Sequence, residues 1–346
     1  MPTPKDLMNS VFRAERVNRI PFAPAVYEHK AFLIDESPSK VAKDSELLYE
    51  ALLEEYSTYS PDLLTVGLDV YNIEPEALGC KVNFYSESDN VPVIRDRIVD
   101  NREDIFELEV PDPDTAGRMP LMLKAGKRIN KKLGDEVYIR GAVSGPFSLA
   151  CHLGGQQKTI MAAHEGSDFI RDLLELSTTT IKEFAKAWVE AGLGVVVFDS
   201  LASPPLISPE TYSKLIKPYH EKLFGYLDNF ELSHKPLIIG GNTTSIASEL
   251  ADVGADYLLC DYDADKETYL EISEEEGITV RFNLDPDKIK NKAPEDLKNM
   301  VLETIEKGKD FTRFVLGTGV LVYDTPKENV LRVREVCREQ VGDNFA

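Results

Sequence analysis

The sequence is short of basic residues and of cysteine. It has 39 Lys and Arg against 60 Asp and Glu, a formal net charge of −21 at pH 7. Nucleic-acid binding needs Lys and Arg to neutralise phosphates, so this balance argues against that function. The four cysteines, Cys80, Cys151, Cys260 and Cys337, form no C-x-x-C pair. Their wide spacing argues against a disulfide scaffold and is typical of a reducing compartment.

Long apolar runs are also missing. The sequence has no stretch approaching the ~18–20 apolar residues of a membrane helix. Its first residues, MPTPKDLMNSVFRAERVNR, are too polar for the core of a secretory signal. The hydrophobic share of 42% nevertheless provides for a large core. We therefore expect a soluble, cytoplasmic protein.

What the sequence does have is a repeated event, in which an apolar strand ends and a polar residue follows at once. The clearest runs are VVVFDS with Asp199, PLIIGGNTT with Asn242, DYLLCD with Cys260 and Asp261, TVRFNLDP with Asn283, and RFVLGTG with Thr318. Helical stretches separate them, as the crossovers between parallel strands require. The pattern predicts a (β/α)₈ TIM barrel over residues 1–346 as one domain. In that fold the carboxyl ends of the strands build the active site, so these polar residues are candidate site residues.

The other elements follow from periodicity and from turn residues. Strands are expected at IPFAPAV, DLLTVG, EVYIRGAVSG and GVVVFDS, and at about 236–240, 256–260, 279–283 and 313–317. Helices are expected over 3–16, 44–60, 114–134 and 166–192, over SPETYSKLIKPYHEKLFGYL, and over TPKENVLRVREVCREQ. Residues 80–112 interrupt the alternation, and KVNFYSE and VPVIRDRIV predict a β-hairpin insertion on the barrel.

Several segments together resemble the uroporphyrinogen decarboxylase superfamily. They are NRIPFAP, EALGCKV, SGPFSLACHLGG, DSLASPPLISPETYSKLIKPY, GGNTT, FNLDP and LGTGVLVYDTPKENV, in this order along nearly the whole chain. The resemblance implies a TIM barrel and two kinds of activity. One is porphyrinogen decarboxylation, and the other is methyl transfer involving a corrinoid carried on a partner protein, often with zinc. It also implies a homodimer.

The decarboxylase branch of the resemblance implies paired arginines after the first strand, which clamp substrate carboxylates. Here FAPAVYEHKAFLI has no arginine and carries Glu28 and His29 instead. Asp69 matches the family's aspartate for pyrrole NH groups, but His152 replaces its tyrosine and Thr318 its histidine. A decarboxylase of a porphyrinogen or a smaller acid is therefore the alternative function, with Asp69 as its surviving feature.

The methyltransferase branch implies a zinc ion that activates a thiol. At the positions of its ligands this sequence has Ile238, Gly240 and Gly319, which cannot bind metal. A different ligand set could be rebuilt at the barrel mouth. Its candidates are His29, Glu28, Cys260 and Asp261, with Asp199 as a further one.

The leading hypothesis is a methyltransferase that moves a methyl group between a small methylated ether or thiol and a corrinoid on a partner protein. Its candidate catalytic residues are Asp199, His152, Asp69 and Glu74, of which Asp199, Glu74 or His152 would protonate the departing atom. Its candidate substrate-binding residues are Tyr27, Tyr71, Asn242, Asn283 and Thr318. A barrel that only binds a ligand is a further alternative. Asn242 has a helix-capping alternative, and Cys260 one as inert packing.

Overall fold

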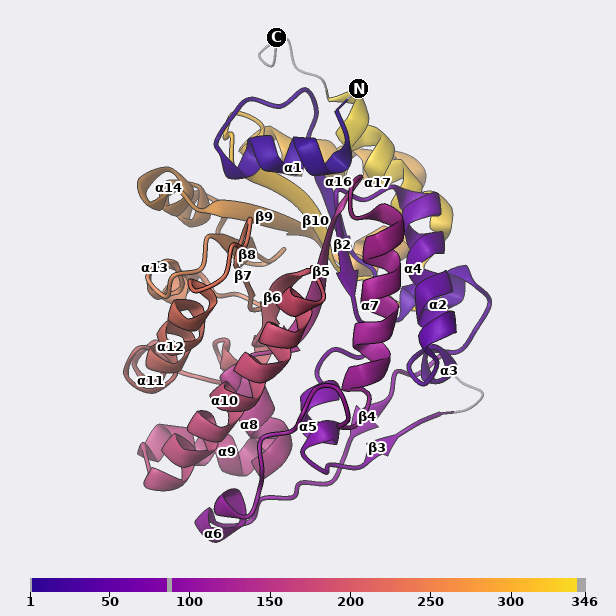
Figure 1. Cartoon of the computed structure of the whole chain (residues 1–346). Coiled ribbons are helices and arrows are strands. Elements are labelled where there is room, and N and C mark those ends of the chain that lie inside the picture. Colours follow the sequence, from indigo (N-terminus) through magenta and orange to yellow (C-terminus); the bar gives the residue numbers. More distant parts are fainter. Residues whose placement is uncertain (1, 86–88, 341–346) are drawn as a thin grey trace.

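The computed structural model describes residues 2–85 and 89–340. Eight parallel strands form a nearly closed barrel surrounded by helices (Figure 1), in the order β1-β10-β9-β8-β7-β6-β5-β2. The strands are β1 (Phe22–Ala25), β2 (Leu63–Val66), β5 (Tyr138–Ser144), β6 (Gly194–Phe198), β7 (Pro236–Ile238), β8 (Tyr257–Cys260), β9 (Thr279–Leu284) and β10 (Phe314–Val320). The predicted TIM barrel is confirmed, and each of the eight expected strands is present.

The barrel closes between β1 and β2, where the backbone and the side chain of Asp62 both bond Phe22. Asp62, directly before β2, donates its backbone N–H to the carbonyl of Phe22 at 2.8 Å. Its side chain accepts the Phe22 N–H at 2.7 Å and a bidentate pair of bonds from Arg19 at 2.7 and 2.5 Å. Charge-assisted pairs of this kind are stronger than neutral hydrogen bonds. Asp62 therefore joins the two strands at the amino-terminal end of the barrel.

The outer layer consists of helices that follow the strands along the chain. The longer ones are α1 (Pro4–Phe12), α4 (Ser45–Tyr59), α7 (Met119–Leu133), α8 (Pro146–Gly154), α9 (Gln156–Glu165), α10 (Asp168–Glu190), α12 (Lys217–Leu227), α14 (Lys266–Glu276), α16 (Pro294–Gly308) and α17 (Lys327–Glu339). The shorter ones are α2 (His29–Leu33), α3 (Pro38–Val41), α5 (Ile73–Ala77), α6 (Arg102–Phe106), α11 (Pro209–Thr211), α13 (Ala247–Ala251) and α15 (Pro286–Asn291). Of the described residues, none lies in a helix long and apolar enough to cross a membrane.

The helix expected over residues 208–227 is not continuous. It begins as predicted, with the Ser208 hydroxyl accepting the N–H of Thr211 at the start of α11. A π-helical stretch, Tyr212–Ile216, then separates α11 from α12. Pro218, near the start of α12, has no N–H to donate to the preceding turn. The π-helical turn thus lies directly before the position where this donor is missing.

The two ends of the barrel differ. At the amino-terminal end α1 lies across the opening (Figure 1), and Leu7, Met8 and Val11 pack against Tyr257 inside the barrel. At the opposite end two short strands, β3 (Val82–Asn83) and β4 (Val93–Ile94), pair antiparallel. This hairpin lies beside α5, away from α1 (Figure 1). One end of the barrel is thus filled, and the other is built up by added segments.

The only tryptophan fixes the helices against the barrel wall. Trp188 of α10 is fully buried. A Cβ on Gly141 of β5 would lie 2.0 Å from its ring, and one on Gly126 of α7 would lie 2.5 Å from it. Only glycine therefore leaves room at these two positions for the indole, which packs α7 and α10 onto β5.

Candidate active site

A cavity of about 520 Å³ lies at the carboxyl ends of the strands, inside the barrel mouth. Its walls are mostly apolar, and β4 contributes to one side. The polar side chains that line it are Tyr27, Glu28, Asp69, Tyr71, Asn72, His152, Gln156, Ser200, Asp261, Arg281, Asn283 and Thr318. Ligand sites in this fold occupy this place, and such cavities combine apolar walls with a few polar groups.

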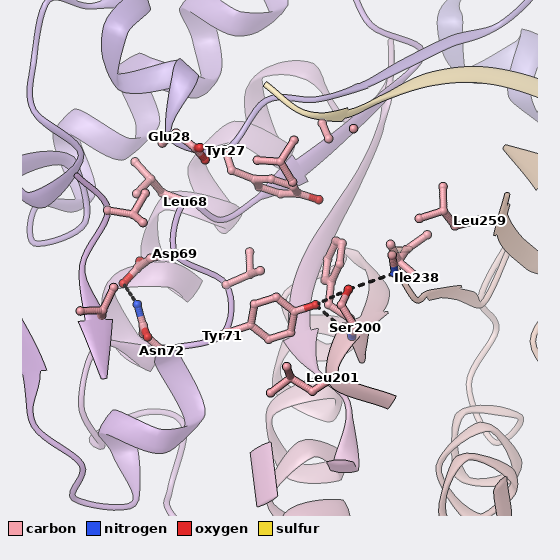
Figure 2. Close-up of a pocket in the computed structure, with 18 of the residues that line it drawn as sticks. Tyr27, Glu28, Leu68, Asp69, Tyr71, Asn72, Ser200, Leu201, Ile238 and Leu259 are labelled. Atoms are coloured by element: carbon pink, nitrogen blue, oxygen red, sulfur yellow. Dashed lines mark hydrogen bonds between the residues drawn. The ribbon is translucent and has the colours of Figure 1, made fainter. Parts of the chain in front are cut away.

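One chain of hydrogen bonds crosses the cavity wall. The Tyr71 hydroxyl donates to Ser200 Oγ at 2.9 Å and accepts the Ser200 N–H at 3.2 Å. Ser200 Oγ in turn accepts the N–H of Gly240 at 3.1 Å (Figure 2). Burial raises the pKa of Tyr71 to about 12. The phenol is therefore protonated at neutral pH and its position is fixed.

Asp69 lies at the cavity edge, but its carboxylate is occupied. Arg118 donates to both of its oxygens, at 2.9 and 2.7 Å, and also to Glu76 at 2.5 Å. Asn72 donates to Asp69 at 3.0 Å (Figure 2) and to the carbonyl of Pro92 in the hairpin at 2.6 Å. Asn72 therefore links Asp69 to the inserted hairpin. With three hydrogen bonds from Arg118 and Asn72, the Asp69 carboxylate has little capacity left to bind a ligand.

Asp261 and Asn283 form a second polar group on the opposite wall. Asn283 donates to Asp261 Oδ1 at 3.0 Å, and the backbone N–H groups of Tyr262 and Gly241 bond its two oxygens at 3.0 and 2.8 Å. The side-chain oxygen of Asn283 is buried and has no partner among the described residues. That oxygen is a free acceptor on a residue that lines the cavity.

His152 and Thr318 both line the cavity, at the positions where the family carries tyrosine and histidine. The His152 ring is tilted against Tyr71, with 6.2 Å between ring centres. Burial lowers the pKa of His152 to about 4, so its imidazole is neutral at pH 7. Thr318 is fully buried, and its hydroxyl accepts the Ala25 N–H at 3.0 Å.

Tyr27 and Glu28 lie next to each other at the side of the cavity formed by β1 (Figure 2). Burial raises the pKa of the Glu28 carboxyl, which has no ion-pair partner among the described residues. Burial also raises the pKa of Tyr27. Burial therefore favours the protonated form of both groups, which can donate a hydrogen bond or a proton to a ligand in the cavity.

Arg281 is a cavity residue that the sequence reasoning missed. It lies on β9, two residues before Asn283, and its side chain is 3% exposed. Because strand side chains alternate, residues 281 and 283 share the inward face. That two-residue spacing was the signal available in the sequence.

Five of the predicted site residues lie outside the cavity lining. His29 is fully buried behind it, with its ring nitrogens 2.7 Å from the Tyr323 carbonyl and 2.7 Å from the Tyr59 hydroxyl. The side chain of Asn242 accepts the N–H of Thr244 at 3.2 Å and donates to the carbonyl of Asp263 at 3.0 Å, so it holds together two loop segments. The others are Glu74, Asp199 and Cys260.

The three remaining residues are buried in the wall around the barrel. Glu74 accepts the N–H and the hydroxyl of Ser144 at 2.7 and 2.9 Å. Asp199 bonds the first turn of α8 and is not part of the cavity lining. Cys260 lies in the outward-facing core, and burial raises the pKa of its thiol to about 12. An inert thiol is typical of such packing.

The predicted metal ligands do not come together. Glu28 and Asp261 line the cavity, whereas both nitrogens of His29 are engaged elsewhere and Cys260 faces the core. Within residues 2–85 and 89–340 no group of three or more His, Cys, Asp and Glu is placed to hold a metal ion. The described donor set does not fit a zinc site of the kind that the resemblance implies.

A TIM barrel with a polar-lined cavity at the carboxyl ends of its strands is the architecture of TIM-barrel enzymes. Similarity to known proteins shows which family of these enzymes the chain belongs to. The chain belongs to the uroporphyrinogen decarboxylase family, whose model matches residues 3–340. This confirms the resemblance.

Two relatives represent the branches of that family. A methylcobamide:CoM methyltransferase MtbA from Methanosarcina mazei is 27% identical over 344 residues, covering 97% of this chain and 98% of its own. A uroporphyrinogen decarboxylase from Prochlorococcus marinus is 24% identical over 309 residues, covering 86% of this chain and 84% of its own.

A solved structure supports the fold. A methyltransferase from Methanosarcina mazei superimposes with a TM-score of 0.85 at 22% identity, covering 99% of this chain and 100% of that one. The likeness extends over the whole barrel.

Proposed function

We propose that this protein transfers a methyl group between a small methylated compound and a corrinoid carried by a partner protein. The observation that carries the proposal is the similarity to methylcobamide:CoM methyltransferases over 97% of the chain. The cavity supports it, because its volume of about 520 Å³ suits a small molecule and it can be reached from outside. Val320, which lines it, is 46% exposed.

The corrinoid supplies the nucleophile that takes up the methyl group, and the residues of this chain act on the other fragment. When the bond between methyl carbon and heteroatom breaks, the heteroatom keeps the electron pair and needs a proton. Glu28 is the carboxyl best suited to give it, since burial favours its protonated form. Tyr27 and Tyr71 line the same cavity, and their proposed role is to contact the substrate, Tyr71 mainly through its ring because Ser200 engages its hydroxyl.

In this mechanism a proton from Glu28 activates the leaving heteroatom, a role that differs from the activation of a thiol by zinc. The positions that the resemblance assigns to zinc ligands, Ile238, Gly240 and Gly319, all line the cavity. Their side chains offer no donor atom, so these positions cannot hold a metal, and the acid in our proposal is Glu28 of the same lining. Of the three acids predicted from the sequence, Asp199 and Glu74 lie outside the cavity lining. The third, His152, lines the cavity, but burial lowers its pKa to about 4, so its ring is neutral at pH 7.

The alternative, a decarboxylase, has weaker support. Its surviving feature was Asp69, which would have to accept hydrogen bonds from substrate NH groups. Arg118 already donates to both of its oxygens, and Asn72 to one. A free carboxylate is therefore not available for that role.

The test is a methyl-transfer assay with purified protein and free cob(I)alamin, using a series of methyl ethers and methyl thioethers as donors. Formation of methylcobalamin is followed by its absorbance. We expect transfer with at least one donor and at least a tenfold lower kcat in Glu28→Gln. The control is Glu107→Gln, an exposed carboxyl just after α6.

Absence of transfer with every donor, combined with decarboxylation of uroporphyrinogen, would overturn the proposal in favour of the alternative. We also propose a homodimer and a cytoplasmic location, as the resemblance and the composition imply. Light scattering on the purified protein checks the first, and cell fractionation checks the second.

A further inference from the structure

We propose that Arg281 binds a terminal oxyanion of the small-molecule substrate, so that the substrates of this enzyme are small organic anions. The inference rests on the proposed function only in that the bound anion is taken to be the substrate of methyl transfer. The binding itself follows from the charges inside the barrel.

The Arg281 guanidinium is buried without a partner. Its side chain is 3% exposed and borders the cavity, and its Nε forms no hydrogen bond among the described residues. No described carboxylate forms an ion pair with it. A buried charge costs several kcal/mol unless it is paired, so an unpaired one bordering a cavity calls for a ligand of opposite sign.

A second buried guanidinium adds to the positive charge. Arg140 of β5 donates from Nε to Thr65 at 3.1 Å, while its Nη1 has no partner among the described residues. Its burial and the nearby charge of Arg281 both lower the pKa of Arg140. The two arginines occupy the level between the apolar cluster at the amino-terminal end and the cavity above it. No described carboxylate forms an ion pair with either of them. Asp69 and Asp261 line the same cavity, but Arg118 binds the first, and Asn283 and two backbone N–H groups bind the second.

The barrel wall makes room for Arg281. A Cβ on Gly317 of β10 would lie 2.6 Å from Arg281 Cδ and 2.9 Å from Nε. Any other residue there would displace the side chain. The neighbouring strand is thus adapted to hold this arginine against the wall.

Further polar atoms lie around the same floor. The hydroxyl group of Tyr27, a hydrogen-bond donor, belongs to a residue that lines the cavity together with Arg281. The unpartnered oxygen of Asn283 is an acceptor and would take a donor group of the ligand, not its oxyanion. An anion bound to the guanidinium would place the rest of the molecule towards Glu28 and the mouth. The planar fork of an arginine suits an oxyanion, which it binds through paired hydrogen bonds.

The experiment is calorimetric titration of the corrinoid-free protein with four probes. They are methoxyacetate, its uncharged amide 2-methoxyacetamide, 2-methoxyethanesulfonate and inorganic phosphate. We expect at least one anion to bind ten times or more tighter than the amide. The relative affinities of the three anions then identify a carboxylate, a sulfonate or a phosphate as the preferred group.

The variants assign the binding to one side chain. Arg281→Met is expected to remove the preference for the anion, and Arg281→Lys to retain part of it. Arg128→Met, an arginine on the outside of α7, is expected to bind as the wild type does. Three results would each overturn the proposal. They are equal binding of anion and amide, an unchanged affinity for the anion in Arg281→Met, and no saturable binding of any anion.

Stability distinguishes binding from a structural role. Ligand-free Arg281→Met should unfold at the same denaturant concentration as the wild type or at a higher one, because an unpaired buried charge opposes folding. A clear loss of stability would show that the arginine holds the barrel together, and would also overturn the proposal. Since no corrinoid is present, these results do not depend on whether methyl transfer is observed.

Discussion

His220 and Asp199 form a fully buried pair, with 2.8 Å between Nε2 and Oδ2. The other ring nitrogen of His220 lies 2.9 Å from the Tyr212 hydroxyl. Asp199 also accepts the N–H groups of Phe147 and Ser148 in the first turn of α8, at 3.1 and 2.6 Å. The carboxylate thus anchors the amino-terminal end of α8, the helix that carries the cavity residue His152.

We expect Asp199→Ala to lower the free energy of unfolding by about 3–5 kcal/mol, because it removes one partner of a buried pair and leaves two helix N–H groups unbonded. Denaturant titration measures the change. Asp252→Ala is the control, since its exposed pair with Lys217 is worth about 1 kcal/mol or less. Unchanged stability with abolished methyl transfer would instead favour the catalytic role predicted from the sequence.

Arg118→Met should also destabilise the protein, by about 3–5 kcal/mol, because it leaves Asp69 and Glu76 without their shared cation. The double variant Asp69→Asn/Arg118→Met should lose less than the single variant, since the buried carboxylate is gone. Unfolding of the three proteins by urea gives the comparison. Equal losses in the single and double variants would show that the pair is not coupled.

The fold was predictable because strand and helix patterns dominate its segments. VVVFDS and TVRFNL are rich in the β-branched and aromatic residues that strands favour, and the structure has β6 and β9 there. The chain order of strands and helices then leaves little choice of architecture, because parallel strands need crossovers.

The site was only partly predictable, because a strand end does not decide where its next side chain points. Asp261 follows β8 and turns into the cavity, whereas Asp199 follows β6 and turns to α8. The difference lies in Gly145, where a Cβ would come within 2.2 Å of Asp199 Cβ. That contact joins segments far apart in the sequence. The alternation of side chains along a strand could have predicted that Arg281 faces inward with Asn283. No sequence pattern predicts that Arg118 binds Asp69, because the two residues are far apart in the chain.

His152 should not titrate near neutral pH. Burial disfavours the charged ring and lowers its pKa to about 4, from an ordinary value of 6.5. Between these two values the unfolded chain binds more protons, so His152 makes folding less favourable as the pH falls through this range. The imidazole resonances, assigned with His152→Gln, should stay constant from pH 8 to about pH 5. A midpoint near 6.5 would show that the ring is solvated.

The pH dependence of methyl transfer should follow Glu28. Burial raises the pKa of its carboxyl, and the proposed role requires the protonated form. The rate should therefore be highest on the acidic side and fall as the pH rises through that pKa. In Glu28→Gln the remaining rate should lose this dependence. A rate that rises with pH and is unchanged in the variant would exclude Glu28 as the acid.

Glu74 allows a test of stability against pH that is independent of activity. Burial raises the pKa of its carboxyl to about 7, from 4.5, despite two hydrogen bonds from Ser144. The folded chain holds the extra proton between these values, so the Glu74 contribution to stability falls as the pH rises from about 4.5 to 7. For a fully buried group this amounts to roughly 3 kcal/mol.

Glu74→Gln should abolish that part of the pH dependence. A glutamine can accept the Ser144 N–H with its oxygen and donate to the Ser144 hydroxyl with its amide. The variant should therefore match the wild type near pH 4.5 and exceed its free energy of unfolding at pH 8 by about 3 kcal/mol. Urea titrations across this range, with the exposed Glu271→Gln as control, measure the difference. If the wild type and Glu74→Gln differ by the same amount at every pH, the carboxyl is ionised throughout, and its bonds to Ser144 outweigh the cost of burial.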